Sequence, residues 1–269
     1  MAGIWPADIQ CVANLTFDVD GVSSWLYRDP NLAKRPNIMS MAEYGPSVAA
    51  WHILDMLDRH SIKSTFYIPG YVAERHVPLV KEIVNRGHEV GHHGYMHEAP
   101  SALSEEDEKE ILEKGIHILE DITGYKPLGY RAPTFELSEM TFDFLKSYGF
   151  KYDTSLMGDD APYVLNTAHG DLLELPVSLY LDDFPHVIFA PSTGRTSPQK
   201  SPDDLFEIWA AEFEVLYRYG RSFTLVMHPQ VIGRPGRLLM LERLIGYIRS
   251  YPNVAFARMI DMAEMWKGS

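Results

Sequence analysis

Apolar and polar positions along this chain follow two alternating patterns, one typical of strands and one typical of helices. Short apolar runs that end in acids or in Pro-Gly predict buried strands at 11–20 and 63–70. Between them, apolar side chains recur at helical spacing over residues 45–62, which predicts an amphipathic helix. Its apolar face consists of Val48, Trp51, Leu54 and Leu57. Residues 36–46 carry apolar side chains in a predicted loop, which suggests a lid or a subunit contact.

The same alternation continues to the end of the chain. Ser104 with Asp107 and Pro202 mark helix starts, and Gly124 marks a helix end. Strands that alternate with helices at this spacing predict parallel βα units, and seven or eight of them predict an α/β fold, a closed or nearly closed (β/α) barrel. An open doubly wound sheet is the alternative. The further helices are predicted at 77–87, 103–124, 138–149, 201–220 and 234–251, and the further strands at 128–133, 150–155, 171–178, 221–229 and 253–257.

Composition narrows the classes of function. The 269 residues show no linker, repeat or low-complexity run, so we expect one domain over 1–269. A net charge of −13 argues against a nucleic-acid partner. Cys11 is the only cysteine and lies in an apolar run, which predicts a core residue and no intrachain disulfide. No apolar stretch reaches the roughly 20 residues that span a bilayer, and the first ten residues lack the pattern of an export signal, so we expect a cytoplasmic protein without a membrane partner.

Four histidines crowd the stretch NRGHEVGHHGYMHEAP at 85–100 and allow two metal-binding interpretations. His88 and His92 match the H-E-x-x-H pattern of helical zinc proteases. That pattern needs a helix, whereas Gly91 and Gly94 interrupt one here, at about 1 kcal/mol each relative to alanine. We therefore expect His88 to be structural at a strand start and His92 either to face the barrel wall or to lie behind the metal ligands.

The other histidine pair, His93 and His97, lies where a strand runs out into a loop. In LTFDVD, Asp18 and Asp20 are two residues apart and so project to the same side of a strand. Polar side chains gather at the carboxyl ends of several predicted strands, the edge that carries the active site of (β/α) barrels. These residues are Asp18, Asp20, His93, Arg131, Asp153 and His228.

In that order, the segments LTFDVD, HGYMH, GYRAP and LVMHP resemble the polysaccharide deacetylase superfamily, the NodB-like carbohydrate esterases of family 4. The segments FDVDGVSSWL and GHEVGHHGYMHEAP are most similar to a branch of peptidoglycan-deacetylase-like proteins and cyclic imide hydrolases. The resemblance implies a distorted (β/α) barrel and one divalent metal ion, usually zinc. It implies a metal triad, a general base with an arginine that orients it, and a general acid. Asp20, His93 and His97 correspond to the metal triad. Asp18 corresponds to the general base and Arg131 to the arginine that orients it, and His228 corresponds to the general acid.

Two departures from the family pattern bear on the substrate. Val19 separates the two aspartates, as in the imide-hydrolysing branch. The usual R-x-P-Y motif ends here in Thr134, whose backbone N–H still suits an oxyanion hole but whose side chain lacks the aromatic contact with a sugar. The resemblance therefore implies metal-dependent hydrolysis of a non-peptide amide bond, in either an N-acetyl amino sugar or polysaccharide, or a small cyclic imide.

Less specific expectations complete the picture. Trp25 and Tyr27 line either a pocket or an interface, and a homo-oligomer is expected from the relatives. Glu136, Asp182 and Asp183 are either groups next to the site or surface acids, with a slight preference for the surface. Asp153 and Asp160 are weaker candidates for substrate contact. Two other functions remain open, a zinc protease built on His88 and His92 and a metal-free barrel relative without catalysis.

Overall fold

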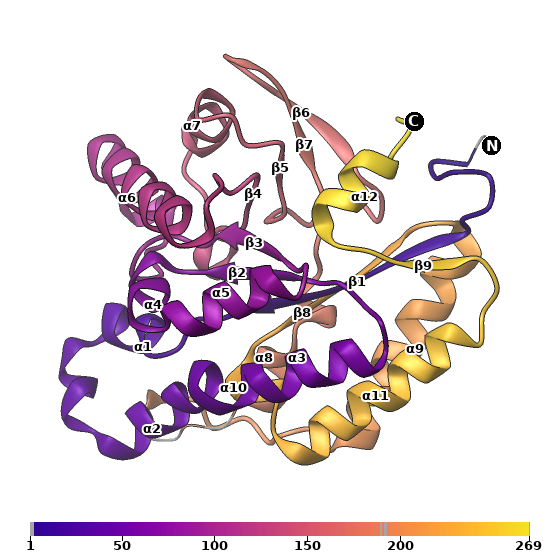
Figure 1. Ribbon diagram of the computed structural model, residues 1–269, viewed down its shortest axis with the longest axis horizontal. Coiled ribbons are helices and arrows are strands. Elements are labelled where there is room, and N and C mark those ends of the chain that lie inside the picture. Colours follow the sequence, from indigo (N-terminus) through magenta and orange to yellow (C-terminus); the bar gives the residue numbers. More distant parts are fainter. Residues whose placement is uncertain (1–2, 189, 191–192, 269) are drawn as a thin grey trace.

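The computed structural model describes residues 3–188, 190 and 193–268, which form a mostly parallel sheet covered by helices (Figure 1). Its strand order is β6-β7-β5-β4-β3-β2-β1-β8, with β9 also paired to β1. Among the strand pairs of the described residues, only β6–β7 is antiparallel. The strands are β1 Cys11–Asp18, β2 Thr65–Ile68, β3 Glu89–His92, β4 Gly129–Tyr130, β5 Tyr152–Asp153, β6 Tyr163–Thr167, β7 Gly170–Glu174, β8 Ser222–Met227 and β9 Val254–Phe256.

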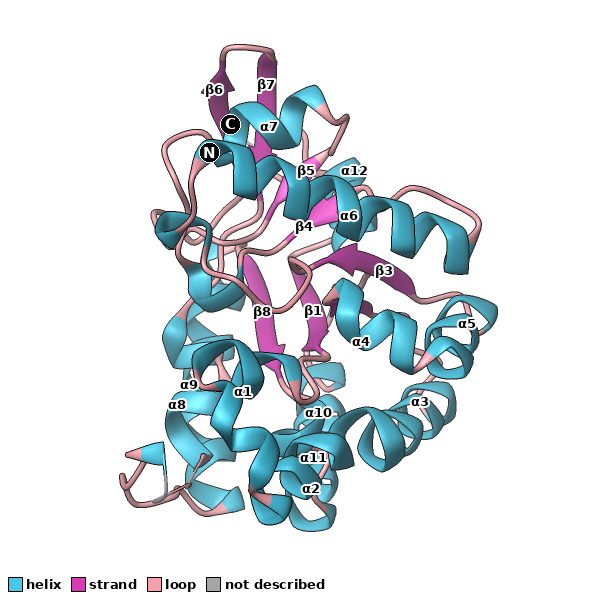
Figure 2. Cartoon of the chain, turned by 90° about the vertical axis from the view of Figure 1, so that its left-hand side faces the viewer, coloured by secondary structure: helices cyan, strands magenta, loops and turns pink. Residues whose placement is uncertain are grey.

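This order confirms the predicted α/β fold. From β1 to β5 each strand pairs with its successor, and β8 returns to the free side of β1, so the chain winds in one direction as in a (β/α) barrel (Figure 2). Between the described strands the ladder stays open. An isolated parallel bridge joins Asp182, in the segment after β7, to Val226 of β8 and spans part of that gap.

Helices cover the outside of the sheet. The principal ones are α1 Ser23–Arg28, α2 Pro36–Tyr44, α3 Ala50–Arg59, α4 Gly70–Arg75, α5 Val77–Asn85, α6 Glu105–Thr123, α7 Thr141–Ser147, α8 Asp183–Val187, α9 Pro202–Tyr219, α10 Pro229–Ile232, α11 Pro235–Arg249 and α12 Met259–Met265. The predicted caps are confirmed: Ser104 accepts a hydrogen bond from the Asp107 N–H, and Gly124 ends α6 with a left-handed φ of 82°. In the described part of the chain, no helix is long and apolar enough to cross a bilayer.

Two local predictions were wrong. Residues 36–44 are not a loop but the helix α2, whose Ile38 and Ala42 are buried. A π-helical turn over Gly45–Ala49 then separates α2 from α3. Because a π turn holds an extra residue, it shifts the buried face, and Val48 is exposed although it was assigned to the same face as Leu54.

The hairpin of β6 and β7 was predicted only in part. Its second strand covers 170–174 instead of 171–178, and β6 at 163–167 was missed. Residues of β6 alternate between half-buried and exposed at the edge of the sheet, so no apolar run marks them. Cys11 is fully buried as expected, and burial raises the pKa of its thiol to about 12.

Candidate active site

The two aspartates of LTFDVD lie together at the carboxyl end of β1. Asp18 is the last residue of the strand and Asp20 follows it, and both line one pocket. Val19 between them points the other way and belongs to the main hydrophobic core. The two-residue period of a strand therefore persists past its end and directs both carboxylates to the same side.

The histidines come from the loop that follows β3. Gly94 turns this loop with a φ of 71°, and His97 itself adopts a left-handed φ of 68°. The buried carboxylate of Glu98 accepts hydrogen bonds from the N–H groups of Tyr95 and Met96 at 3.0 and 2.8 Å. Glu98 thus holds the short arc that brings the rings of His93 and His97 to 5.0 Å between centroids.

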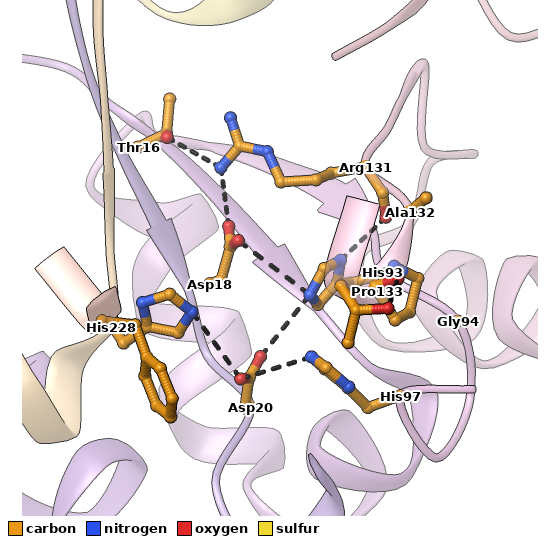
Figure 3. A network of polar contacts seen from close by, with 12 residues as sticks. Thr16, Asp18, Asp20, His93, Gly94, His97, Arg131, Ala132, Pro133 and His228 are labelled. Carbon is orange, nitrogen blue, oxygen red and sulfur yellow. Dashed lines mark hydrogen bonds and ion pairs between the residues drawn. The ribbon is translucent and has the colours of Figure 1, made fainter. Parts of the chain in front are cut away.

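Asp20, His93 and His97 converge closely enough to hold a metal ion (Figure 3). Nε2 of His93 lies 3.5 Å from Oδ1 of Asp20, and Nε2 of His97 lies 3.4 Å from Oδ2. Burial alone raises the pKa of Asp20, but His97, His93 and His228 outweigh it and hold that pKa well below its usual value. Asp20 is therefore a carboxylate at neutral pH.

A divalent cation fits this donor set. Nδ1 of His93 lies 2.7 Å from the carbonyl oxygen of Arg131, and because a carbonyl only accepts, Nδ1 carries the proton. The lone pair of Nε2 therefore faces an anionic oxygen. Oδ1 of Asp20 is buried and has no hydrogen-bond partner among the described residues. Two electron-rich atoms in contact call for a positive charge between them, and His–carbonyl contacts of this kind orient metal ligands.

Arg131 fixes the second aspartate. It is fully buried, and its Nη1 donates to Asp18 Oδ1 at 2.7 Å and to Thr16 Oγ1 at 2.8 Å. Its guanidinium also stacks over the ring of Tyr67, 4.2 Å from the centroid. Burial lowers the pKa of Arg131, but the charge of Asp18 outweighs it and raises the pKa. Oδ1 of Asp18 is thus engaged, while Oδ2 is 4.0 Å from His93 Nε2.

His228 faces the same pocket from the end of β8. Nδ1 of His228 donates to Asp183 Oδ1 at 2.7 Å, and the backbone N–H of His228 donates to Asp183 Oδ2 at 2.9 Å. Since both oxygens of Asp183 accept, Asp183 is a carboxylate. Burial disfavours the charged imidazole, but Asp183 and Asp182 outweigh it and raise the pKa of His228 well above its usual value. Nε2 of His228 remains directed at Asp20, 3.8 Å from Oδ2.

Asp182 completes this side of the site. It is buried, lines the pocket and lies 3.6 Å from His228 Nδ1. Burial raises its pKa to about 7; the charge of His228 opposes this rise and Asp183 reinforces it. The slight preference for Asp182 and Asp183 as surface acids was wrong: both are buried against His228.

The pocket has a volume of about 240 Å³. Of the weaker sequence candidates, Trp25 and Thr134 line it. Thr134 has a left-handed φ of 58°, an unfavourable conformation for a residue with a branched Cβ. Glu136, Tyr27, Asp153 and Asp160 do not line this pocket, so their placement does not support substrate contact. Asp153 instead lies fully buried and accepts a hydrogen bond from Ser155 at 2.8 Å.

His88 and His92 have structural roles. His88 Nδ1 accepts the N–H of Ser64 at 3.1 Å, and His92 contacts the carbonyl of Leu112 at 3.2 Å. Burial lowers their pKa values to about 4 and about 3. Residues 89–92 form β3 rather than a helix, so the zinc protease interpretation of His88 and His92 is wrong.

Several site residues escaped the sequence reasoning. Glu98 follows His97 directly, and a carboxylate next to a histidine pair is a signal that was overlooked. No local pattern marks Arg28, Phe184 or Arg195, which also line the pocket, because each comes from a loop or short helix outside the strand ends.

Known proteins similar to this chain share its fold over nearly the whole length. The family described as polysaccharide deacetylase matches residues 32–152. The peptidoglycan deacetylase of Helicobacter pylori is 32% identical over 92% of this chain and 93% of its own. A crystal structure of a candidate polysaccharide deacetylase from Mycobacterium smegmatis superposes with a TM-score of 0.94 at 39% identity, covering 98% of this chain and 93% of that one. The crystal structure of PuuE allantoinase superposes with a TM-score of 0.85 at 27% identity, covering 97% of this chain and 92% of that one.

Proposed function

This chain belongs to the polysaccharide deacetylase family, and we propose that it hydrolyses non-peptide amide bonds with the help of one divalent metal ion. The observation that carries the proposal is the convergence of Asp20, His93 and His97, with Asp20 Oδ1 lacking a hydrogen-bond partner among the described residues. These three residues would hold the ion, and zinc suits two imidazoles and a carboxylate. A bound divalent cation would supply Lewis acidity, which polarises an amide carbonyl and lowers the pKa of water.

The remaining steps belong to side chains of this chain. Asp18 accepts the proton of the attacking water at Oδ2, since Arg131 already donates to Oδ1. His228 delivers a proton from Nε2 to the leaving nitrogen, because Asp183 holds Nδ1 and fixes the ring. Thr134 at the pocket wall is the proposed donor to the developing oxyanion through its backbone N–H.

Two substrate classes suit this chemistry. The name of the Helicobacter pylori relative points to an N-acetyl sugar, and the name of the allantoinase points to a small ureide ring. A pocket of about 240 Å³ lies below the usual range for ligand sites of roughly 300–1,000 Å³, which favours a small substrate. We therefore favour a cyclic imide or ureide and retain the N-acetyl amino sugar as the second candidate.

Hydrolysis of succinimide, hydantoin and N-acetylglucosamine oligomers by zinc-loaded protein tests the proposal. We expect turnover of at least one of the three, its loss in Asp18→Asn, and its retention in Asp121→Asn, since Asp121 is exposed on α6. Turnover of sugars alone would exclude the ring-opening activity. A protein that binds the metal but hydrolyses none of these amides would contradict the proposed function and favour a non-catalytic relative.

A further inference from the structure

Two arginines at the pocket, Arg28 and Arg195, have no carboxylate partner among the residues that the structure describes. Arg28 ends α1, and Arg195 lies in the segment between α8 and α9. Six other arginines form ion pairs with carboxylates, namely Arg59, Arg86, Arg131, Arg218, Arg243 and Arg258. Within the described residues neither Arg28 nor Arg195 forms an ion pair, so both leave their charge available to a ligand in the pocket.

Arg195 is held close to the reacting groups. Its guanidinium carbon lies 4.6 Å from the ring centroid of Phe184, whose ring lies 5.1 Å from that of His228. The guanidinium of Arg195 and the imidazole of His228 thus both contact the ring of Phe184. Ala190 anchors the Arg195 backbone by donating to its carbonyl at 2.9 Å and accepting from its N–H at 3.3 Å.

Trp25 adds a further donor on the same wall. It is 3% exposed and lines the pocket, and its Nε1 is buried without an acceptor in the described part of the chain. Trp25 and Arg28 are three residues apart on α1 and so share a face of that helix. The Nε of Arg195 is likewise buried and unpartnered. A buried donor without a partner destabilises the fold, so these donors indicate an acceptor that is not a protein group.

Electrostatics supports the same conclusion. Burial lowers the pKa of Arg195, and the charge of Arg28 lowers it further, so the two cations repel each other across the pocket. A guanidinium nevertheless stays charged at neutral pH. An anion placed between them removes the repulsion and fills the empty donor positions, and a planar carboxylate matches the fork of an arginine.

We propose that Arg28, Arg195 and Trp25 form a carboxylate-binding subsite. The preferred substrate is then an amide that carries a carboxylate, separated from the scissile C–N bond by about the width of an aromatic ring. This rests on the proposed function of the pocket. Both candidate substrate classes include such molecules. N-acetylmuramic acid carries a carboxylate that N-acetylglucosamine lacks, and hydantoin-5-acetic acid carries one that hydantoin lacks.

The test compares kcat/KM within each of these pairs for the wild type, Arg195→Gln and Arg28→Gln. We expect the wild type to prefer the carboxylated member by roughly tenfold or more, mainly through KM, as for a hydrogen bond to a charged group. Arg195→Gln and Arg28→Gln should each lower kcat/KM more for the carboxylated member than for the neutral member and so reduce that preference, and Arg195→Lys should restore part of it. Arg218→Gln on α9, with a side chain 70% exposed, is the matched control and should change nothing. The pair that shows the preference identifies the source of the carboxylate.

Equal kcat/KM for charged and neutral substrates would overturn the subsite, as would an equal loss for both in Arg195→Gln. If no amide is turned over, the proposed function fails and binding decides the subsite by itself. Calorimetry with succinate and its neutral analogue succinamide then serves as the probe. Weaker succinate binding in Arg195→Gln than in the wild type supports the subsite, and identical binding of both probes to both proteins overturns it.

Discussion

Asp183→Asn changes one atom of the group that orients His228. Asp183 is fully buried and accepts two hydrogen bonds from His228, one from Nδ1 and one from the backbone N–H. An amide has a single oxygen, so one of the two His228 donors would face an NH₂ group. The substitution therefore removes a negative charge and one hydrogen bond without a change in volume.

The expected loss follows from the lost bond. Hydrogen bonds to charged groups contribute roughly 1.5–3 kcal/mol, and a barrier raised by that amount slows kcat by roughly 10- to 150-fold. The pH profile should change as well. Asp183 raises the pKa of His228, and an acid must be protonated to act. Removing the charge lowers that pKa, so the alkaline limb of the kcat profile moves to lower pH.

The assay measures kcat and KM across the pH range for the wild type and Asp183→Asn on the same amide. Thermal melting checks that the variant folds, and Asp121→Asn, a change at an exposed position of α6, serves as the control. A folded Asp183→Asn protein with the wild-type kcat and an unmoved alkaline limb would refute the role of His228 as the acid.

Three further outcomes are expected. Arg131→Lys, which cannot span the contacts of the buried guanidinium, should lower kcat by roughly tenfold or more in steady-state kinetics; unchanged kcat would refute its orienting role. Gly115→Ala places a Cβ against the ring of His92 and should destabilise the fold by roughly 1–3 kcal/mol in urea unfolding, whereas Gly246→Ala, with open space around it, should not; equal effects would contradict the packing. Burial lowers the pKa of His88 to about 4, so between about pH 6.5 and pH 4 this histidine takes up a proton only in the unfolded chain, and the free energy of unfolding falls as the pH falls. His88→Asn should reduce this pH dependence in unfolding curves measured at several pH values. An unchanged pH dependence would count against a neutral buried His88.

The parts of the site that follow strand ends were accessible from the sequence. Asp18 and Asp20 are marked by a buried strand and a two-residue period, and the histidine pair is marked by glycines that exclude a helix. The convergence of these segments required only that parallel strands share a carboxyl edge. The roles of Asp18 and Asp20 came from the family resemblance and stay predictions.

The other side of the pocket could not be predicted in this way. Asp183 contacts His228 across 45 residues of sequence, and the segment that carries it meets β8 through one bridge between Asp182 and Val226. Adjacent aspartates before Phe-Pro resemble a solvated turn when only local sequence is considered. Arg28 and Arg195 belong to irregular segments, where no periodicity indicates which way a side chain points. The π turn before α3 was missed for the same reason, because a single extra residue leaves no compositional trace.

Metal content combined with anomalous scattering at the zinc edge tests the central claim most directly. The account predicts one equivalent of metal and one anomalous peak at ligand distance, about 2.0–2.2 Å, from Asp20, His93 and His97. It predicts that His93→Ala loses this metal and that His88→Asn, which alters a buried histidine outside the triad, keeps it. A protein that binds no metal, or a peak bound instead by Asp182, Asp183 and His228, would contradict the account.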